Sequence, residues 1–502
     1  MVTPSVPSAP RAPVLELHLV PAGTALPEGY PVRAPGGAEA RAVLSRAGAV
    51  AHVALPARDR ADLRWIVDQV VRALAAPAGI DDVRLFGPGM DPDTLATIAL
   101  DLHQRTGGQV EVKTAEVAAR VARVGPYEDG FRAWVNEDPS LRTSRAMARD
   151  VSAWAADQPR VTVEVLDEAA LADAGLRLLL AVGGAGRSSP PRLILARYRP
   201  PGSDARAPAQ AHAHDQVPDH DHDRPLLLLG KGITFDSGGL NVKPYEAFVS
   251  MMKSDMAGAA LAFTLFRALV EAGSALPLAL ALPACDNGLG SRAMKPGAVV
   301  ESYAGTRVRI DHTDAEGRLI LADALAYAGD RLRPRKVLCF ATLTTAALVS
   351  YGPYATPVHF ADPALVARLS AASALTGEDL HFFPERLWHL EANRDREVDL
   401  RNTARLPGDA VRGAGSRNAA HFLRHFAPAP LCHFDIFGST WNWAGDAPGA
   451  GYGATGAPLR TLLRGFGIGA GADEALPGAM DAVDECAHEP APGGAHEPAP
   501  GG

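Results

Sequence analysis

Cysteine is scarce in this sequence, with only four among 502 residues. They are Cys285, Cys339, Cys432 and Cys486, which lie far apart and form no C-x-x-C pair, and the first three stand in apolar runs. Such spacing argues against a disulfide framework and against a cysteine-based zinc site. The pattern predicts buried thiols in a reducing compartment, and the expected location is the cytoplasm.

Long hydrophobic runs are also missing. The longest, ALPLALALPAC at 275–285, is broken by proline and is too short to span a bilayer. The opening stretch MVTPSVPSAPRAP contains four prolines and lacks the apolar centre of a secretory signal. The sequence therefore predicts neither a membrane-spanning segment nor secretion.

Positive charge is not in excess either. The net charge is −8 and the calculated pI is near 6.1, so bulk electrostatics gives no reason to bind nucleic acid or an anionic membrane. Apolar residues make up 47% and charged residues 21% of the chain, which is typical of a globular protein that buries a sizeable core. The length favours two domains.

The first domain is predicted at residues 14–127, behind a proline-rich, disordered lead at residues 1–13. The segment DRADLRWIVDQVVRALAA (59–76) repeats apolar residues at helical spacing. Three apolar segments around it favour strands: VLELHLV (14–20), AVAHVAL (49–55) and DDVRLFG (81–87). This order is typical of a small α/β domain.

The second, larger domain is predicted at residues 128–470, with YEDGFRAWVNEDPS (127–140) as a connector and a helix at 143–157. Seven short apolar segments predict strands: LRLLLAVG (176–183), RLILARY (192–198), PLLLLG (225–230), LPLALALPAC (276–285), TRVRID (306–311), KVLCFATL (336–343) and LCHFDIFG (431–438). Most are apolar throughout, which indicates a mainly parallel sheet covered by helices on both faces. Ligands of such sheets bind beyond the carboxyl ends of the strands.

Two segments have compositions that do not form a core. Residues 202–224 carry several histidines among Asp, Ala and Pro; a solvated surface insert is favoured over a metal-capturing one. Residues 471–502 end in the octapeptide AHEPAPGG, which occurs twice in succession. This Pro/Gly-rich tail is predicted to be disordered.

One charged cluster lies in DHTDAEGRLILADALAYA, residues 311–328. Asp314, Glu316 and Arg318 precede an apolar helix, and an acidic first turn at the helix dipole is one interpretation. The two carboxylates also reach the same side if the chain is extended there. A role in chemistry is the other interpretation, and this segment alone does not decide between them.

A second cluster lies in GKGITFDSGGLNVKPYEAFVSMMKSDMAGAA, residues 230–260. It holds Lys231, Asp236, Lys243 and Asp255, and its SGG is expected to turn tightly. The spacing of a phosphate-binding loop is absent. Like charges gathered at neighbouring strand ends raise one another's pKa unless cations neutralise them. Both clusters together therefore predict a site for two divalent metal ions.

The segments GKGITFDSGG, VKP, KSDMAGAA, TDAEGRLILADAL, ATLT, HFDIFGSTW and GATG carry a resemblance to a known family. Over about residues 130–465 the chain resembles the leucyl (cytosol) aminopeptidase family and, within it, the bacterial peptidase B type. The resemblance implies a metal-dependent aminopeptidase that removes the N-terminal residue of peptides or dipeptides through a water activated by two metals.

The resemblance also implies roles for individual residues. Five would ligate two divalent ions, with Asp236 and Glu316 bridging them: Lys231, Asp236, Asp255, Asp314 and Glu316. The ions would be zinc or manganese, with magnesium or cobalt as alternatives, and the Lys231 ligand would need a strongly lowered pKa. Lys243 would polarise the scissile carbonyl. Arg318 would hold a bicarbonate ion that acts as general base.

Three positions depart from the family pattern. His312 replaces a usual Asn, either as a hydrogen-bonding substitute, which is favoured, or as an extra metal or substrate contact. Thr345 stands where Gly is typical, in the predicted substrate-binding loop with Thr342 and Leu343. Arg417 occupies a region that usually has small residues, where it would recognise an acidic substrate or reach a subunit contact. These departures leave the substrate specificity less certain from the sequence than the aminopeptidase activity that the resemblance implies.

Two other functions stay open as alternatives. One is a specialised amide hydrolase that acts on a modified small molecule. The other is a non-catalytic or moonlighting role as a DNA-binding or scaffolding hexamer, which the acidic composition disfavours. The resemblance further implies small-peptide substrates and a homohexamer built as a dimer of trimers.

Overall fold

The computed structural model describes residues 14–202, with short gaps before residue 110, and four further ranges: 224–244, 248–404, 413–443 and 452–468. The predicted lead and tail lie outside the described residues, and so does the His-rich insert apart from its two end residues. In the described part of the chain, no helix is long and apolar enough to cross a membrane. Three of the four cysteines fall within it, and all three are buried free thiols, as predicted.

The first sheet has six strands, in the spatial order β2 (Tyr30–Val32), β3 (Glu39–Ser45), β4 (Gly48–Leu55), β1 (Val14–Pro21), β5 (Asp82–Phe86) and β6 (Val110–Val112). Helices α1 (Arg60–Ala78) and α2 (Pro92–Arg105) accompany it. The three strands and the helix predicted for this region are all confirmed. Leu15, Leu17 and Leu19 are fully buried, as their alternation predicts.

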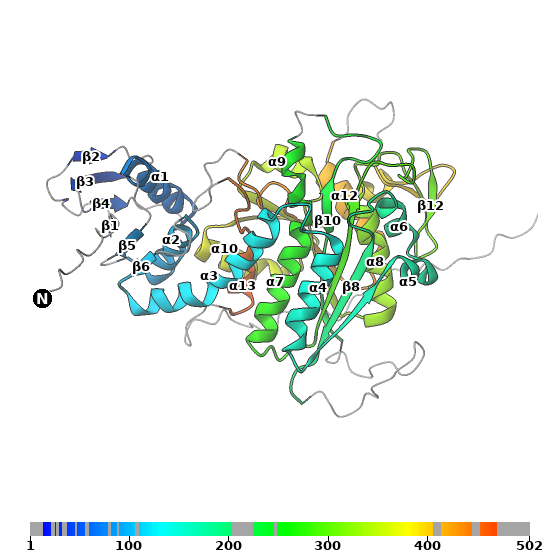
Figure 1. Ribbon diagram of the computed structural model, residues 1–502, viewed down its shortest axis with the longest axis horizontal. Helices are drawn as coiled ribbons and strands as arrows, with labels where there is room; N and C mark the ends of the chain where they lie inside the picture. Colours follow the sequence, from blue (N-terminus) through cyan, green and yellow to red (C-terminus); the bar gives the residue numbers. More distant parts are fainter. Residues whose placement is uncertain are drawn as a thin grey trace, which may run out of the picture.

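Helix α3 (Ala115–Asn136) links this first sheet to the rest of the molecule (Figure 1). The prediction of a connector at residues 127–140 is therefore wrong for the first ten residues, which belong to α3. Apolar side chains such as Phe131 and Val135 are buried at helical spacing. The predicted domain boundary at 127–128 falls inside α3. We propose that α3 is the joint between the two predicted domains.

The second sheet has nine strands and a parallel centre. Its main path is β16 (Asp379–Phe383), β15 (Ala355–His359), β18 (Leu431–Asp435), β14 (Lys336–Ala341), β9 (Leu226–Gly230), β11 (Leu278–Asn287), β8 (Arg192–Tyr198) and β7 (Val161–Leu166), with β10 (Gly232–Asp236) paired to β11. The pairs β18–β14, β14–β9 and β9–β11 are parallel, while β11–β8 and β8–β7 are antiparallel. This confirms the predicted α/β class with a mainly parallel, helix-covered sheet.

Strand β9 shows why its sequence is apolar throughout. Leu226 and Leu228 belong to one core cluster with α7 (Ala257–Glu271). Leu227 and Leu229 belong to the opposite cluster with α8 (Gly317–Leu332). Because successive side chains point to opposite faces, a strand buried on both faces has no polar positions.

Further helices cover the two faces and ends of this sheet (Figure 1). They are α4 (Ser144–Ala156), α5 (Glu168–Ala174), α6 (Arg177–Gly183), α9 (Thr345–Tyr351), α10 (Pro363–Thr376), α11 (Trp388–Glu391), α12 (Gly415–Phe426) and α13 (Leu459–Gly465). A separate small sheet joins β12 (Val299–Glu301), β13 (Arg307–Arg309) and β17 (Leu400–Arg401).

Two predicted strands need correction. LRLLLAVG forms helix α6, because Asp323 accepts hydrogen bonds from the Leu178 and Leu179 backbone amides at its first turn. TRVRID forms β13, but in the small sheet rather than the large one. The other five predicted strands and the helix predicted at 143–157 are confirmed as β8, β9, β11, β14, β18 and α4.

Candidate metal centre

The two charged clusters meet at one edge of the second sheet. Lys231 directly follows β9, and Asp236 ends β10. Asp255 lies in the 3₁₀ helix η3 (Val249–Met256) that leads into α7, while Glu316 is the residue before α8. These elements lie in different places along the chain, and the fold brings their ends together.

Three carboxylates form the centre of this cluster. One oxygen each of Asp236, Asp255 and Glu316 lies within 4.8 Å of the others, and all three residues are buried. Lys231 Nζ lies 2.7 Å from Asp255 Oδ1 and 2.9 Å from Glu316 Oε1. It also donates a hydrogen bond to the Thr342 carbonyl. A Cβ on Gly317 would lie 2.5 Å from Lys231 Cε, so only glycine leaves room for this lysine.

Lys243 forms a second positive group on the other side of the cluster. Its Nζ lies 2.8 Å from Asp236 Oδ2 and also pairs with Asp314. The SGG turn before it is confirmed, because Gly238 and Gly239 have φ angles of 87° and 63°. Asp314 thus faces Lys243 and lies outside the tight group of three carboxylates, although it lines the same pocket.

The segment around Asp314 is not extended. A hydrogen bond from the Ala315 amide to the His312 carbonyl closes a turn, and Glu316 already has helical backbone angles. The expectation of an extended chain here is wrong, since the turn brings Asp314 towards Lys243. Helix α8 does begin at Gly317, as the sequence indicates, and Leu321 and Leu325 are fully buried.

Burial and crowding set the ionisation of these groups. Burial, with repulsion from Glu316 and Asp236, raises the pKa of Asp255 well above its usual range. Burial and repulsion from Asp236 and Glu316 raise the pKa of Asp314 to about 7. Burial opposes the charge of Asp236, but Lys243 and Lys231 outweigh it and lower its pKa. The carboxylates therefore compete for too little positive charge.

The carboxylates around Lys231 shift its pKa in the direction opposite to the one that metal ligation requires. Burial would lower the pKa of its ammonium, but attraction to Asp255, Glu316 and Asp236 outweighs burial and raises that pKa. A lysine nitrogen binds a metal only when it is neutral. Cations that share these carboxylates would have to remove this attraction before Lys231 could become a ligand.

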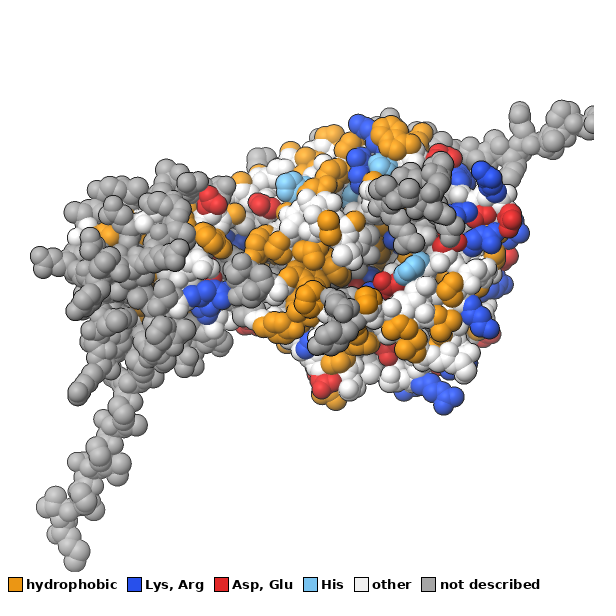
Figure 2. All heavy atoms as spheres, turned by 90° about the horizontal axis from the view of Figure 1, so that it is seen from above, with side chains coloured by type: hydrophobic (Ala, Val, Ile, Leu, Met, Phe, Trp, Pro, Cys, Tyr) orange, Lys and Arg blue, Asp and Glu red, His pale blue; other side chains and the backbone are white. Residues whose placement is uncertain are grey.

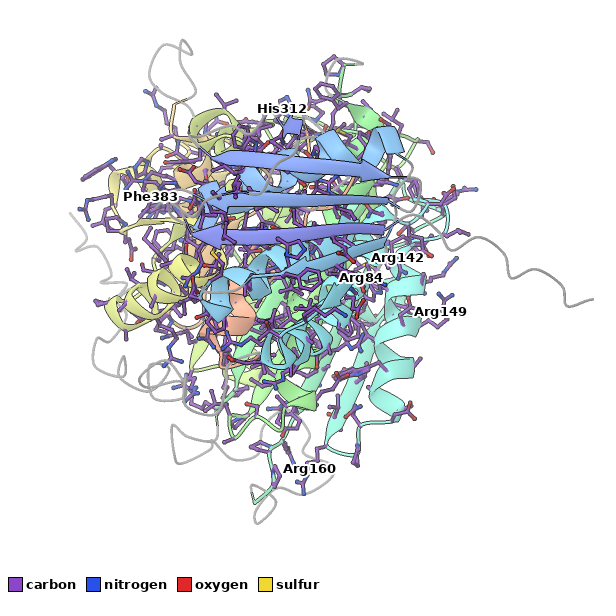
Figure 3. All side chains as sticks on the ribbon, turned by 90° about the vertical axis from the view of Figure 1, so that its left-hand side faces the viewer. Arg84, Arg142, Arg149, Arg160, His312 and Phe383 are labelled. Atoms are coloured by element: carbon purple, nitrogen blue, oxygen red, sulfur yellow. The ribbon has the colours of Figure 1, made fainter. Side chains whose placement is uncertain are left out.

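A pocket of about 220 Å³ opens above this cluster. All residues predicted for the site line it: Lys231, Asp236, Lys243, Asp255, His312, Asp314, Glu316, Arg318, Thr342, Leu343 and Thr345. Apolar side chains of Met252 and Phe437 complete one part of the wall. His312 lies at the upper end of the molecule in Figure 3. Figure 2 looks down on that end, where charged and histidine side chains lie beside an apolar patch.

Arg318 is buried beside the pocket. Its Nη1 donates a hydrogen bond to the Asn402 carbonyl, 2.7 Å away, and its Nε has no hydrogen-bond partner among the described residues. Burial lowers the pKa of its guanidinium to about 10, although Glu316 and Asp435 oppose that shift. A buried guanidinium with a spare donor is suited to an anion.

A buried aspartate that the sequence reasoning missed shapes the loop after β14. Asp435 accepts hydrogen bonds from the backbone amides of Leu343 and Thr344, from the Thr344 hydroxyl at 2.6 Å and from Ser416. Thr342 Oγ1 in turn donates to Asp255 Oδ1, 2.8 Å away. The loop predicted to bind substrate is therefore tied to a carboxylate of the cluster.

Asn287 was also missed. Its side-chain nitrogen donates to Asp236 Oδ1 at 2.8 Å and to the Thr313 carbonyl at 3.0 Å. It ends the buried apolar strand β11, where polar residues are expected to face a ligand, and this position was a usable signal.

Arg417 does not line the pocket. Its guanidinium lies over the Phe383 ring, 5.4 Å from the centroid, and reaches the Pro384 carbonyl. Phe383 and His312 are well separated in Figure 3. The hypothesis that Arg417 recognises an acidic substrate at this site is therefore not supported by its position, whereas Asn418 on the same helix does line the pocket.

The donor set fits divalent cations. Asp255 Oδ2 is buried and lacks a hydrogen-bond partner among the described residues, which costs free energy unless something positive is close. Clustered carboxylate oxygens are ligands that hard divalent ions such as Mg²⁺ and Mn²⁺ prefer, and Zn²⁺ also accepts them. The cluster therefore suits metal binding by its own chemistry.

Comparisons with known proteins agree with this chemistry. Residues 130–463 match the profile of the "Cytosol aminopeptidase family, catalytic domain". A "Probable cytosol aminopeptidase" of Solibacter usitatus (strain Ellin6076) is 35% identical over 368 residues, which cover 73% of this chain and 70% of that protein. A relative with the same description from Halorhodospira halophila (strain DSM 244 / SL1) is 36% identical and covers 81% and 75%.

Solved structures are similar as well. The "Bottromycin maturation enzyme BotP in complex with Mn" superimposes with a TM-score of 0.73 and 28% identity, covering 90% of this chain and 98% of BotP. The cytosol aminopeptidase from Coxiella burnetii gives a TM-score of 0.67 at 28% identity, covering 82% and 85%.

Proposed function

This chain belongs to the cytosol aminopeptidase family and is a peptidase, and we propose that it removes the N-terminal residue of small peptides through a water activated by two divalent metal ions. One observation carries the proposal. Three buried carboxylates with ligand oxygens within 4.8 Å of one another share one pocket with two lysines and an arginine. We propose five ligands: Lys231, Asp236, Asp255, Asp314 and Glu316.

Bound cations would activate a water and stabilise the charge that develops on the scissile carbonyl oxygen. The chain's own groups supply the rest. Lys243 stays cationic, because its carboxylate neighbours outweigh burial and raise the pKa of its ammonium. It lines the pocket and is suited to donate a hydrogen bond to that oxygen.

Arg318 is suited to hold a small anion through its unpartnered Nε. We propose bicarbonate, which would accept the proton of the attacking water. The loop of Thr342, Leu343 and Thr345, together with His312, would contact the peptide, because all four residues line the pocket. The wall formed by Met252 and Phe437 offers apolar surface to a substrate side chain.

The test is peptide hydrolysis by metal-stripped protein after Mn²⁺, Zn²⁺, Mg²⁺ or Co²⁺ is added back. Dipeptides and aminoacyl p-nitroanilides form one panel, and N-acetylated dipeptides form the matched control. We expect metal-restored release of the free N-terminal residue only, and loss of release in Asp255→Asn. Equal cleavage of acetylated substrates, or activity without metal, would contradict the proposal.

A second candidate is a specialised hydrolase that acts on modified peptides. The similarity to a maturation enzyme over nearly its whole length favours it, together with a pocket wall that carries Thr345 and Phe437. Dipeptides and peptides that are N-methylated or cyclised after the first residue should be compared side by side. Turnover confined to the modified peptides would support this candidate over a general aminopeptidase.

The assembly and location are proposals as well. By family resemblance we propose a cytoplasmic homohexamer, a dimer of trimers. Light scattering coupled to size-exclusion chromatography measures the mass directly, and a monomer of 52.5 kDa under assay conditions would exclude it. The net charge of −8 gives no support to nucleic-acid binding as the main role.

A further inference from the structure

Asn402 holds the loop of predicted metal ligands through hydrogen bonds to the loop backbone. It follows strand β17 and is fully buried. Its own amide donates to the Arg309 carbonyl, which continues the pairing of β17 with β13. The side chain is therefore fixed at the end of the small sheet, within hydrogen-bond distance of the loop that holds Asp314.

Every hydrogen-bonding position of the Asn402 carboxamide is used on this loop. Its Oδ1 accepts from the backbone amides of Asp311 at 2.8 Å and His312 at 3.3 Å. Its Nδ2 donates to the carbonyls of His312 at 2.7 Å and Ala315 at 3.3 Å. A carboxamide offers two acceptor and two donor positions, and no other group of this size can match two amides and two carbonyls at once.

The same residue also reaches Arg318. The Asn402 backbone carbonyl accepts the hydrogen bond from Arg318 Nη1 at 2.7 Å, leaving the unpartnered Nε beside the pocket. In the sequence, Asp314 lies between His312 and Ala315, whose carbonyls Asn402 binds, and Glu316 lies between Ala315 and Arg318. One buried residue thus sets the loop and the guanidinium relative to each other.

We propose that Asn402 is a positioning residue for the metal centre: its side chain fixes the turn that presents Asp314 and Glu316, and its carbonyl aims Arg318. Among the described residues, its side chain is hydrogen-bonded to loop backbone and to no carboxylate of the cluster. The inference rests on the proposed function for its catalytic meaning, but its first consequence is metal affinity, because residues that orient ligands typically change metal affinity about 10- to 100-fold when replaced.

The experiment is calorimetric titration of metal-stripped protein with Mn²⁺ alone. Asn402→Ala is compared with Asn393→Ala, because Asn393 is an equally buried asparagine of the same region whose side chain lies among the carbonyls of His389, Arg401 and Asn418 rather than on the loop. We expect Asn402→Ala to weaken the Mn²⁺ Kd about 10- to 100-fold relative to Asn393→Ala. Equal Kd values in the two variants would overturn the proposal.

If Asn402→Ala does not fold, a second variant and a measurement on the unaltered protein still test the proposal. Asn402→Asp keeps the acceptor towards Asp311 and His312 but sets an oxygen against two carbonyls, and it should weaken Mn²⁺ binding too. In the unaltered protein the amides of Asp311 and His312 should exchange slowly with solvent hydrogen. Rapid exchange of both amides would overturn the proposal without any variant.

The readouts separate this inference from the proposed function. If the unaltered protein binds Mn²⁺ but releases no N-terminal residue from any peptide, the proposed function fails, while the Kd comparison still decides the role of Asn402. If peptides are cleaved and Asn402→Ala matches Asn393→Ala in Kd and in kcat, the function stands and the inference falls.

Discussion

The side-chain nitrogen of Lys243 lies 2.8 Å from Asp236 Oδ2, at the border between the buried carboxylates and the pocket. The lysine side chain is only 14% exposed, so its charge depends on the carboxylates. Their attraction outweighs burial and raises the pKa of the ammonium. Lys243 is thus held cationic and placed at the pocket wall, which are the two properties that an electrophilic group needs.

Replacing Lys243 with methionine should separate catalysis from metal binding. The hydrophobic side chain keeps most of the volume but removes the donor, so kcat is expected to fall about 10²- to 10³-fold. Mn²⁺ binding should persist, because the group of three carboxylates remains. Stopped assays and metal analysis of the desalted protein measure the two effects.

Lys253→Met is the matched control for this variant. Lys253 lies on η3 near the site but donates to the Asn136 carbonyl and does not line the pocket. Its kcat should stay within about twofold of the unaltered protein, because the half-buried Lys253 makes its hydrogen bond away from the pocket. Equal losses in both variants would mean that Lys243 acts only through the fold.

Thr345 is expected to restrict the first side chain of the substrate. It begins α9 behind the capping residue Thr344 and faces the pocket. Thr345→Gly removes three heavy atoms from the wall and should raise kcat/KM for leucine substrates relative to alanine substrates about 10-fold, the scale on which pockets discriminate single methylenes. Val349→Ala on the same helix, whose valine is 80% exposed, should leave the ratio unchanged. If Thr345→Gly leaves the leucine-to-alanine ratio of kcat/KM unchanged, Thr345 does not determine the substrate specificity.

The sequence predicted the strands of the parallel centre because a strand buried on both faces leaves a continuous apolar run. It failed at LRLLLAVG, whose composition fits a buried strand or a buried helix equally. What decides for helix is a distant residue: Asp323 accepts from the Leu178 and Leu179 amides at the start of α6. Local pattern carries no information about such a partner.

The gathering of the charged residues in one pocket was predictable, because the sequence predicts that they follow strands of one mainly parallel sheet, whose carboxyl ends meet at one edge. The polar residues that hold these charged residues in place were not predictable. Asn287, Asn402 and Asp435 are single polar residues whose roles arise from contacts with loops that are far away in sequence. Conversely, Arg417 was considered as a substrate contact because it occupies a region that usually has small residues, but the helix turns its side chain onto Phe383.

Asp323 should make stability fall as pH rises through the weakly acidic range. Burial raises its pKa from the ordinary 3.8 to about 6. Between these values the native state binds more protons than the unfolded state, so the free energy of unfolding decreases with pH and levels off above about 6, by about 3 kcal/mol at most. Urea unfolding at pH 4, 5, 6 and 7 measures this slope.

Asp323→Asn is the control for that pH dependence. The amide does not titrate, so the difference in unfolding free energy between the variant and the unaltered protein should change across pH 4 to 6 and then remain constant. The variant should be less stable at low pH, because an amide nitrogen would face one of the three backbone donors that Asp323 now satisfies. Parallel curves over the whole range would contradict the raised pKa.

Arg460 should be essential for attaching the first sheet and its helices to the rest of the molecule. Its guanidinium, on α13, pairs with Glu128 on α3 and lies 2.6 Å from Asp101 Oδ1 on α2. All three side chains are buried. Arg460→Met would leave the buried Glu128 without its cationic partner, whereas Asp101 would keep its pair with Arg64. Removing one partner of a buried ion pair costs about 3–5 kcal/mol.

The matched control is Arg149→Met, because Arg149 pairs with Asp150 at 3.0 Å while 72% of its side chain is exposed. Such a surface pair is worth at most about 1 kcal/mol. Urea unfolding should therefore show a large loss of unfolding free energy for Arg460→Met and almost none for Arg149→Met.

Adding Glu128→Gln to Arg460→Met should restore part of the stability, since it removes one unpaired charge. If the double variant is less stable by the sum of both single changes, Arg460 and Glu128 are not coupled. Because Arg460 does not line the pocket, the fraction of Arg460→Met that remains folded should keep its kcat, which separates a loss of attachment from a loss of chemistry.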